Sequence, residues 1–513
     1  MDWKGFQFST EDGAMLAEDV LAAYAKKAPV PVMLRGILEN VLAPQRLNAL
    51  FESEAEQQYT RTLTFAMIVD LMCRVVTRVQ PSLRAAYRER AADLPVGQRA
   101  IYDKVNGLEP RVSAALVRTT ARELEVVLRT LGQVAPPPVA GYRLKIVDGN
   151  HFSATDRRLR LLRGGGPPLP GQALAVLDPA LGLMIELFPC EDGHAQERSL
   201  LPEVLKTVEP GDLWMEDRNF CTTGFLFGIH QRKGAFLVRQ HGNALHWELL
   251  GERHLLGRTE RGLVYEQAVR LTNDQGQELQ VRRITIVLDQ PTRDGETELH
   301  LLTNLSAEAA DGLLLAPLYL LRWRIETAFA ELTIPLACEI KSLGSPPAAI
   351  FTFATAVVCF NAIQVLKAAL AATHPPAPAP TLNPLLNPLL NPLLNPLPNP
   401  LPNPTPARAP PAPTPAPRSL RDELSLYYIA HEVSTLWRGI DLLTPQSLWD
   451  EQFGKLTASE LADRLRTLAT HVNLRAFRKR PPNQRPPKRT SPSKPGSHVS
   501  TAKVLAGVPP KPK

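Results

Sequence analysis

The sequence predicts a mixed protein of the α+β or α/β class, in which helical regions near both ends of the chain flank a sheet of short strands. From about residue 30 to 133, apolar residues recur every three or four positions, which is the period of a helix. After the prolines of Ala135–Pro138 the pattern changes to short apolar runs. From Tyr142 these runs indicate three strands, a helix, a strand, a helix and a strand, which is the element order of a ribonuclease-H-like sheet.

The helical region before residue 139 rests on three segments with helical period, MLRGILENVL, TFAMIVDLMCRVV and VSAALVRTTARELEVVLRTL. The predicted strands that follow are YRLKIVD, ALAVLD, LMIELF, DLWMED and AFLVR, with helices over 197–206 and 222–231. In a sheet with this order the first and fourth strands lie side by side. Asp148 and Asp217, which end these two strands, are then neighbours despite 69 residues of separation.

Further strand-like runs, ALHWELL, GLVYEQAVRL, ELQVRRITIVLD and ELHLLTNL, predict a β-rich insertion before a helix that carries Glu326. A second helix is predicted over 351–372, and a proline-rich tract then repeats Leu-Asn-Pro-Leu four times. Proline at every fourth position excludes both helix and central strand, so this tract is interpreted as a spacer, with a proline-recognition ligand as the alternative.

These patterns divide the chain into seven regions. They are a helical N-terminal domain (1–138), the first part of the core (139–239), the insertion (240–305), the second part of the core (306–373), the repeat linker (374–417), a C-terminal helical region (418–473) and a basic disordered tail (474–513).

Charge is distributed unevenly along the chain. The formal net charge is +7, but residues 474–513 hold eleven lysines and arginines with no Asp or Glu, so the rest of the chain is negative. Such a tail suits a polyanion such as DNA, with Arg478, Lys479, Arg480, Lys488 and Arg489 as candidate contacts. A purely solubilising tail is the alternative interpretation.

Nothing in the sequence indicates secretion or a membrane span. The five cysteines show no C-x-x-C pair, which is typical of core thiols in a reducing compartment. The N-terminus has neither a basic nor an apolar leader segment, and the most apolar run, 348–360, is too short to span a bilayer. We therefore expect a cytoplasmic protein with no membrane partner.

Three acids carry the chemistry that the sequence indicates. In a helix, Tyr319, Arg322 and Glu326 lie on one face, and Asp148 and Asp217 end neighbouring strands. Clustered carboxylates repel one another unless cations neutralise them, and two Mg²⁺ or Mn²⁺ ions would support displacement at phosphorus. Each acid alone is explained equally well by a turn or an ion pair, so the prediction of a metal site depends on their convergence.

The tract around Glu326 resembles the DDE transposases of bacterial insertion sequences, specifically the insertion sequence four family with its signature Y-x2-R-x3-E-x6-K. Asp148 in IVDGN and Asp217 in MEDRNF are similar to the contexts of the first two family acids. The resemblance extends from about Tyr142 to Ala369, and it assigns the metals to the two aspartates and Glu326.

The resemblance implies cut-and-paste transposition by a homodimer assembled on paired DNA ends, in a bacterial, nucleoid-associated setting. Tyr319 and Arg322 would then contact DNA phosphate, and the N-terminal domain, the insertion and the tail would bind the terminal inverted repeats. One departure stands out: the signature lysine is replaced by Thr333. A catalytically decayed DNA-binding relative and a ribonuclease-H-like nuclease that cuts RNA in hybrids are therefore alternatives.

Overall fold

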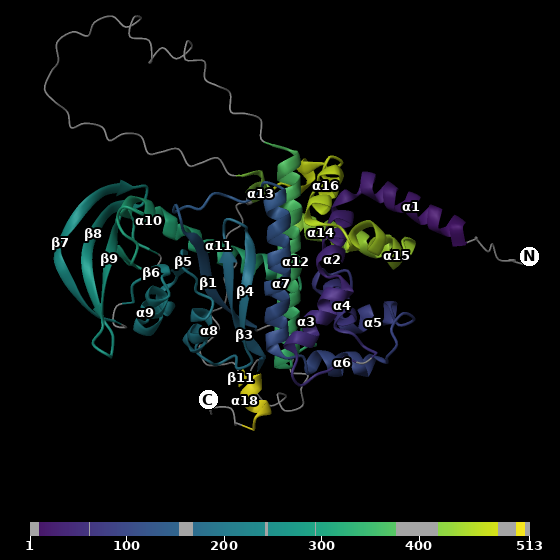
Figure 1. Cartoon of the computed structure of the whole chain (residues 1–513), viewed down its shortest axis with the longest axis horizontal. Helices are drawn as coiled ribbons and strands as arrows, with labels where there is room; N and C mark the ends of the chain where they lie inside the picture. Colours follow the sequence, from purple (N-terminus) through teal and green to yellow (C-terminus); the bar gives the residue numbers. More distant parts are fainter. Residues whose placement is uncertain are drawn as a thin grey trace, which may run out of the picture.

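The computed structural model describes residues 10–60, 62–152, 168–241, 245–292, 294–375, 419–480 and 499–507. Helices form one side of the molecule, and the strands form a sheet that extends away from them (Figure 1). Almost all of the predicted repeat linker lies outside the described residues, and so do Lys488 and Arg489.

The N-terminal region is helical, as the apolar periodicity predicts. Its helices are α1 (Thr10–Lys27), α2 (Pro29–Val41), α3 (Pro44–Glu54), α4 (Phe65–Val76), α5 (Leu83–Glu89), α6 (Gln98–Asn106) and α7 (Pro110–Thr130). Proline occupies the first turn of α2, α3 and α7, where its missing N–H would have no partner in any case. The Thr64 hydroxyl caps α4 by accepting from the Met67 N–H.

The C-terminal helices pack against these N-terminal helices. They are α13 (Leu420–Glu423), α14 (Leu426–Leu443), α15 (Gln446–Trp449), a π-helical turn (Asp450–Gly454), α16 (Ala458–Ala469) and α17 (Leu474–Phe477). The Asn40 side chain donates to the Phe453 and Leu456 carbonyls, and apolar residues of both regions belong to one core. The two predicted helical regions therefore form a single layer.

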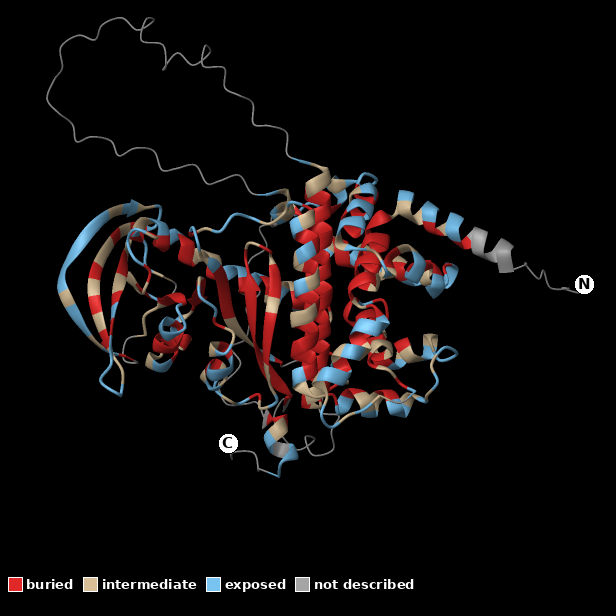
Figure 2. Ribbon diagram, in the orientation of Figure 1, coloured by how far each residue is buried: buried red, intermediate tan, exposed pale blue. Residues whose placement is uncertain are grey.

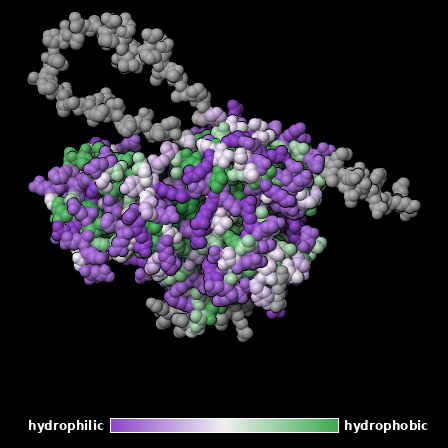
Figure 3. Space-filling view, in the orientation of Figure 1, coloured by the Kyte–Doolittle hydropathy of each residue, from purple (hydrophilic) through white to green (hydrophobic). Residues whose placement is uncertain are grey.

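Helix α12 (Pro346–Thr373) runs beside α7, between the sheet and the other helices, and is buried along almost its whole length (Figures 1 and 2). This helix is long and apolar enough to cross a membrane, but its most apolar stretch is entirely buried inside the protein. In this structure α12 is a core helix. On the visible outer face, hydrophilic side chains predominate, with small apolar areas between them (Figure 3).

A nine-stranded sheet has the order β4-β3-β1-β5-β6-β10-β9-β8-β7. Its strands are β1 (Arg143–Phe152), β3 (Gly171–Asp178), β4 (Leu183–Cys190), β5 (Asp212–Glu216), β6 (Ala235–Arg239), β7 (His246–Thr259), β8 (Gly262–Thr272), β9 (Glu278–Leu288) and β10 (Glu298–Thr303). Strand β1 pairs in parallel with β5, as predicted for the first and fourth strands. Strand β10 pairs with β6, so the insertion continues the core sheet instead of forming a separate body.

Successive residues of the central strands point to opposite faces of the sheet. Ile146 and Met215 belong to the core shared with the helical layer, whereas Val147 and Trp214 belong to a second core. The second core lies under a 3₁₀ turn (Glu197–Leu200), α8 (Leu201–Leu205) and α9 (Thr223–Gln231). The central strands are thus covered on both faces.

The sequence predicts one continuous helix for the segment that carries Glu326. The structure instead divides this segment into three pieces. Helix α10 (Gly312–Leu318) leads into a 3₁₀ turn (Tyr319–Arg322), which leads into α11 (Trp323–Thr333). Pro317 inside α10 lacks an N–H and crowds the preceding turn, which interrupts the regular helical bonding. In a 3₁₀ turn, residues three apart eclipse each other, so Tyr319 and Arg322 stack along one edge.

The C-terminal residues also differ from the predicted disordered tail. Helix α17 falls within that range, and a short strand β11 (Val499–Ser500) pairs with β2 (Pro168–Leu169) before α18 (Thr501–Leu505). Asp192 fixes this end of the chain, because its carboxylate accepts from the Ser500 hydroxyl at 2.6 Å and pairs with the Lys503 ammonium at 2.9 Å. The sequence does not predict this docking, since it depends on a distant loop.

Candidate active site

Asp148 and Asp217 lie level with each other where the pairing of β1 with β5 ends. Asp217 directly follows β5, but Asp148 does not end its strand as the sequence predicts, because β1 continues to Phe152 by pairing with β3. In the β1–β5 ladder Ile146 is opposite Met215, so the two aspartates each follow by two residues and point to the same face. This is the face of the helical layer, where α11 packs against β1. The strand pairing therefore brings together two acids that are 69 residues apart in the sequence.

Local backbone bonds orient each aspartate. Oδ1 of Asp217 accepts from the Asn219 N–H at 2.7 Å and caps the short 3₁₀ turn Arg218–Phe220. Oδ1 of Asp148 accepts from the Gly149 N–H at 2.9 Å. Each carboxylate thus has one oxygen held by the adjacent backbone, and Oδ2 of Asp148 accepts from Arg322.

Arg322 connects Asp148 with Glu326. Its Nη1 donates to Asp148 Oδ2 at 3.1 Å and its Nη2 donates to Glu326 Oε1 at 2.7 Å. Because one guanidinium reaches both acids, their bonded oxygens are within roughly 8 Å of each other. The structure therefore brings two of the three predicted acids, Asp148 and Glu326, to one guanidinium.

The electrostatic environment disfavours an uncompensated negative charge at this site. Burial raises the pKa of Asp148 to about 6, while the Gly149 N–H and the Arg322 guanidinium act in the opposite direction. The carboxylates of Asp217 and Glu197 contribute further to the rise in the pKa of Asp148. A cation close to these acids is thus favourable, and in this structure Arg322 is that cation.

The residues fit a hard divalent cation in donor chemistry, since three carboxylates offer only oxygen ligands. In the part of the chain that the structure describes, however, no group of three or more His, Cys, Asp or Glu side chains is arranged to hold a metal ion. The structure gives a reason for this difference from the predicted two-metal arrangement: the Arg322 guanidinium lies between Asp148 and Glu326.

Tyr319 is buried, and its hydroxyl donates to the Glu216 carbonyl at 3.0 Å. Burial raises the pKa of the phenol well above its ordinary range, so Tyr319 is a neutral hydrogen-bond donor. It ties the end of β5, just before Asp217, to the 3₁₀ turn that carries Arg322. The predicted contact of Tyr319 with phosphate stays a prediction.

Three of the predicted tail contacts pack against the C-terminal helices. The Arg478 guanidinium is 3.7 Å from the Glu423 carboxylate, and the Lys479 N–H donates to the Glu423 carbonyl. The Arg480 guanidinium lies 5.4 Å from the ring centre of Tyr428. Their binding to DNA stays a prediction, as does that of Lys488 and Arg489.

Sequence reasoning missed a supporting group formed by Glu197, Arg198 and Asn219. Asn219 Nδ2 donates to Glu197 Oε2 at 2.6 Å, and Arg198 Nε donates to the Asn219 carbonyl at 2.5 Å. The Glu197 carboxylate also lies against Gly149, where any β-carbon would overlap it. In the sequence, only Gly149, directly after Asp148, and Asn219, two residues after Asp217, could have indicated this group. Neither residue is a specific signal by itself.

Trp247 and Tyr265 of the insertion are each covered by an arginine. The Arg283 guanidinium lies 5.1 Å from the ring centre of Trp247, and that of Arg253 lies 4.0 Å from the ring centre of Tyr265. These rings are partly buried. Cation–π packing between strands accounts for both without a nucleic acid.

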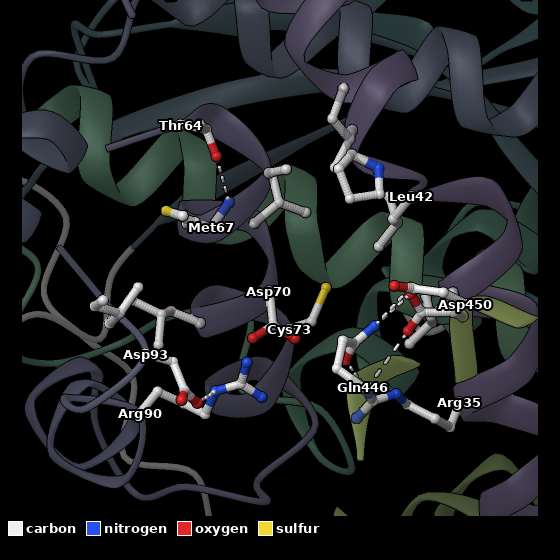
Figure 4. Close-up of a pocket in the computed structure, with 18 of the residues that line it drawn as sticks. Arg35, Leu42, Thr64, Met67, Asp70, Cys73, Arg90, Asp93, Gln446 and Asp450 are labelled. Carbon is white, nitrogen blue, oxygen red and sulfur yellow. Dashed lines mark hydrogen bonds and ion pairs between the residues drawn. The ribbon is translucent and has the colours of Figure 1, made fainter. Parts of the chain in front are cut away.

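A separate cavity of about 380 Å³ lies in the helical layer and not at the acids. It is bordered by Arg35, Asp70, Cys73, Gln446 and Asp450, among others (Figure 4). Asp148, Asp217 and Glu326 do not line it. Its polar side chains are largely paired with one another, as Gln446 is with Arg35 and Asp450, so we assign no ligand to it.

Two comparisons with known proteins cover the segment that contains the acids. Residues 142–348 match the family described as Transposase DDE domain, and this range contains Asp148, Asp217 and Glu326. Among solved structures, the piggyBac transposase in a synaptic complex with hairpin DNA aligns with 65% of this chain and 74% of its own, at 11% identity and a TM-score of 0.31. No curated protein matches the sequence. The segment that holds the three acids is therefore similar to the transposase DDE domain.

Proposed function

We propose that the protein is a DDE transposase of the insertion sequence four family that cuts and rejoins DNA at the ends of its own element. The observation that carries the proposal is the placement of Asp148 and Asp217 at the same level of two paired strands, with Glu326 joined to Asp148 through one guanidinium. The match of residues 142–348 to the transposase DDE domain supports the same reaction class. The strand order and parallel pairing around β1 support a ribonuclease-H-like core.

In this proposal Asp148, Asp217 and Glu326 are the residues that hold two Mg²⁺ or Mn²⁺ ions. When bound, such ions activate the attacking oxygen and neutralise charge on the leaving oxygen. The protein's own groups position these acids: Asn219 and Gly149 orient the aspartates, and Tyr319 fixes the end of β5. Arg322 and Tyr319 are the proposed contacts to the DNA phosphate next to the cut.

The proposed partners follow from this reaction. They are the terminal inverted repeats of the element, the target DNA and a second copy of this chain on the paired end. The proposed setting is the bacterial cytoplasm, in association with the nucleoid, because that is where the substrate lies. Cross-linking on DNA that carries both ends checks the homodimer, since a monomer would yield no protein–protein product at any ratio of protein to DNA.

Cleavage of supercoiled DNA that carries the gene with its flanking sequence tests the activity. In Mg²⁺ the natural protein should release the element, whereas Asp217→Asn should lower the cleavage rate by about 10³-fold or more, because it removes a charged ligand with little change in shape. Asp463→Asn, at an exposed position on α16, is the matched control and should cut normally. Equal cleavage by both variants would refute the proposed role of Asp217.

Thr333 favours one alternative, a relative that binds DNA but has lost turnover. It ends α11, two turns after Glu326, and its hydroxyl donates to the Phe329 carbonyl at 2.9 Å. Threonine, unlike the lysine of the signature, carries no charge that could attract a DNA phosphate. Cleavage gained only in Thr333→Lys would identify a decayed copy. The other alternative, a nuclease for RNA in hybrids, predicts faster cutting of an RNA–DNA duplex than of element DNA.

A further inference from the structure

The Arg322 guanidinium occupies the place between two acids that the proposed function assigns to metal binding. It donates to Asp148 Oδ2 and to Glu326 Oε1, the two oxygens of these acids that face each other. The second oxygen of Asp148 is already bonded to the Gly149 N–H. A cation that bridges Asp148 Oδ2 and Glu326 Oε1 therefore competes with Arg322 for these oxygens.

The two halves of this bridge differ in how firmly they are held. The Asp148 side chain is 17% exposed and the Arg322 side chain 11%, so their contact is largely removed from water. Glu326 is 41% exposed and pairs with Arg322 across one helical turn, an arrangement that water and salt weaken. The bridge is thus strong enough to order the acids and weak enough on one side to open.

We infer that Arg322 is a built-in counter-cation that competes with divalent metal for Asp148 and Glu326 until a DNA phosphate draws it away. This inference rests on the proposed function and adds to it a coupling between two ligands. A guanidinium binds phosphate through two parallel hydrogen bonds, so DNA offers Arg322 a replacement for the two carboxylates. Once Arg322 has moved, the acids are left without a counter-charge, and metal affinity rises.

The coupling has a direct thermodynamic consequence. If DNA raises the affinity for metal by a given factor, metal raises the affinity for DNA by the same factor. The protein without DNA would then hold metal weakly, which limits cleavage to the bound end of the element. Arg322 is a positioning residue in the DNA-free state and a phosphate contact in the bound state.

Binding of Mn²⁺ to the full chain, followed by electron paramagnetic resonance without DNA, tests the inference. Arg322→Ala should bind Mn²⁺ about tenfold more tightly than the natural protein, since the competing cation is gone. Arg322→Lys, which keeps the charge but cannot bridge two carboxylates, should show a smaller gain in affinity. Arg324→Ala removes a neighbouring arginine that pairs with the Pro179 carbonyl and Asp422, and it should leave Mn²⁺ binding unchanged.

Adding the DNA that flanks the gene completes the test. The natural protein should gain Mn²⁺ affinity with this DNA, and Arg322→Ala should gain little. Equal or weaker Mn²⁺ binding by both Arg322 variants, with an unchanged melting temperature, would overturn the inference while leaving the metal site intact. If instead Asp217→Asn does not change Mn²⁺ binding in any of these proteins, the proposed metal site itself fails.

Discussion

At the scale of single residues, Gly149 shows how closely the site is packed. A β-carbon at this position would overlap the Glu197 carboxylate, which accepts a hydrogen bond from the Asn219 side chain. Asn219 in turn orients Asp217 through its backbone N–H. The absence of a side chain beside Asp148 therefore affects the geometry of the second aspartate.

We expect Gly149→Ala to lower the cleavage rate by about tenfold or more, because a displaced Glu197 releases Asn219 and shifts Asp217. The melting temperature should change little, since Glu197 is a flexible side chain that can move aside. Gly224→Ala in α9 is the control, because a β-carbon there has no neighbour within 4 Å, and it should retain full activity. Equal activity of the two variants would contradict the role given to Glu197.

At the scale of elements, the contact between the N-terminal and C-terminal helices depends on Asp441 of α14. Its carboxylate pairs with Arg35 of α2, with Arg74 of α4 at 2.5 Å and with the Trp437 indole at 2.9 Å. The Arg74 side chain is 1% exposed, so it is costly to leave without a partner. This group joins segments that are more than 360 residues apart in the sequence.

Asp441→Asn should therefore lower the free energy of unfolding by about 1.5–3 kcal/mol, because two buried arginines lose their shared counter-charge. The loss stays in this range because Arg35 keeps Glu39 and Arg74 keeps Asp70 as partners. Denaturant unfolding measures the change. Asp463→Asn removes an ion pair on α16 in which the Asp463 side chain is 70% exposed, and it should cost less than about 1 kcal/mol. A similar loss for both variants would show that the Asp441 group does not stabilise the layer.

Helix α12 carries a buried lysine whose charge should make stability depend on pH. Burial is the main reason that the pKa of Lys367 falls to about 8; Glu331 opposes the fall in pKa, and nearby Lys479 and Arg421 add to it. Because the ordinary pKa of 10.5 applies to the unfolded chain, the unfolded state binds more protons between pH 8 and 10.5. Stability from this group therefore rises with pH across that window and is lost as the pH falls through 8.

Lys367→Met should accordingly stabilise the protein at pH 7, by on the order of 1 kcal/mol, since it removes a charge from the core. The gain should shrink as the pH rises from 8 to 10.5, where the natural lysine becomes neutral. Melting temperatures across this range measure it, with Lys206→Met at an exposed position of the sheet domain as the control. A gain that does not vary with pH would show that packing, and not charge, is responsible.

At the scale of the whole molecule, the C-terminal residues are attached at two places, on the C-terminal helices through 474–480 and on the loop around Asp192 through 499–505. Positive charge near the end of the chain is thus held against the protein body at both places. This changes which truncation is informative: removal from residue 474 would take away both attachments, whereas removal from residue 481 keeps the one on the C-terminal helices.

Deleting residues 481–513 should weaken DNA binding and flatten its salt dependence. If six or more cations of the whole tail meet phosphates, the affinity of the natural protein should fall by roughly 10³ between about 50 and 200 mM salt. The deletion removes seven lysines and arginines and should leave a clearly smaller slope. An unchanged slope would exclude the tail from DNA binding.

The sequence by itself determined the helices and strands around the acids, and it placed Asp148 beside Asp217, because alternating burial and element order constrain how strands can pair. Only the tertiary structure decided that β10 joins the insertion to the core sheet and that both helical regions share one core. It alone also placed Arg322 between Asp148 and Glu326. These outcomes depend on contacts between distant segments, whose energies no local pattern of residues encodes.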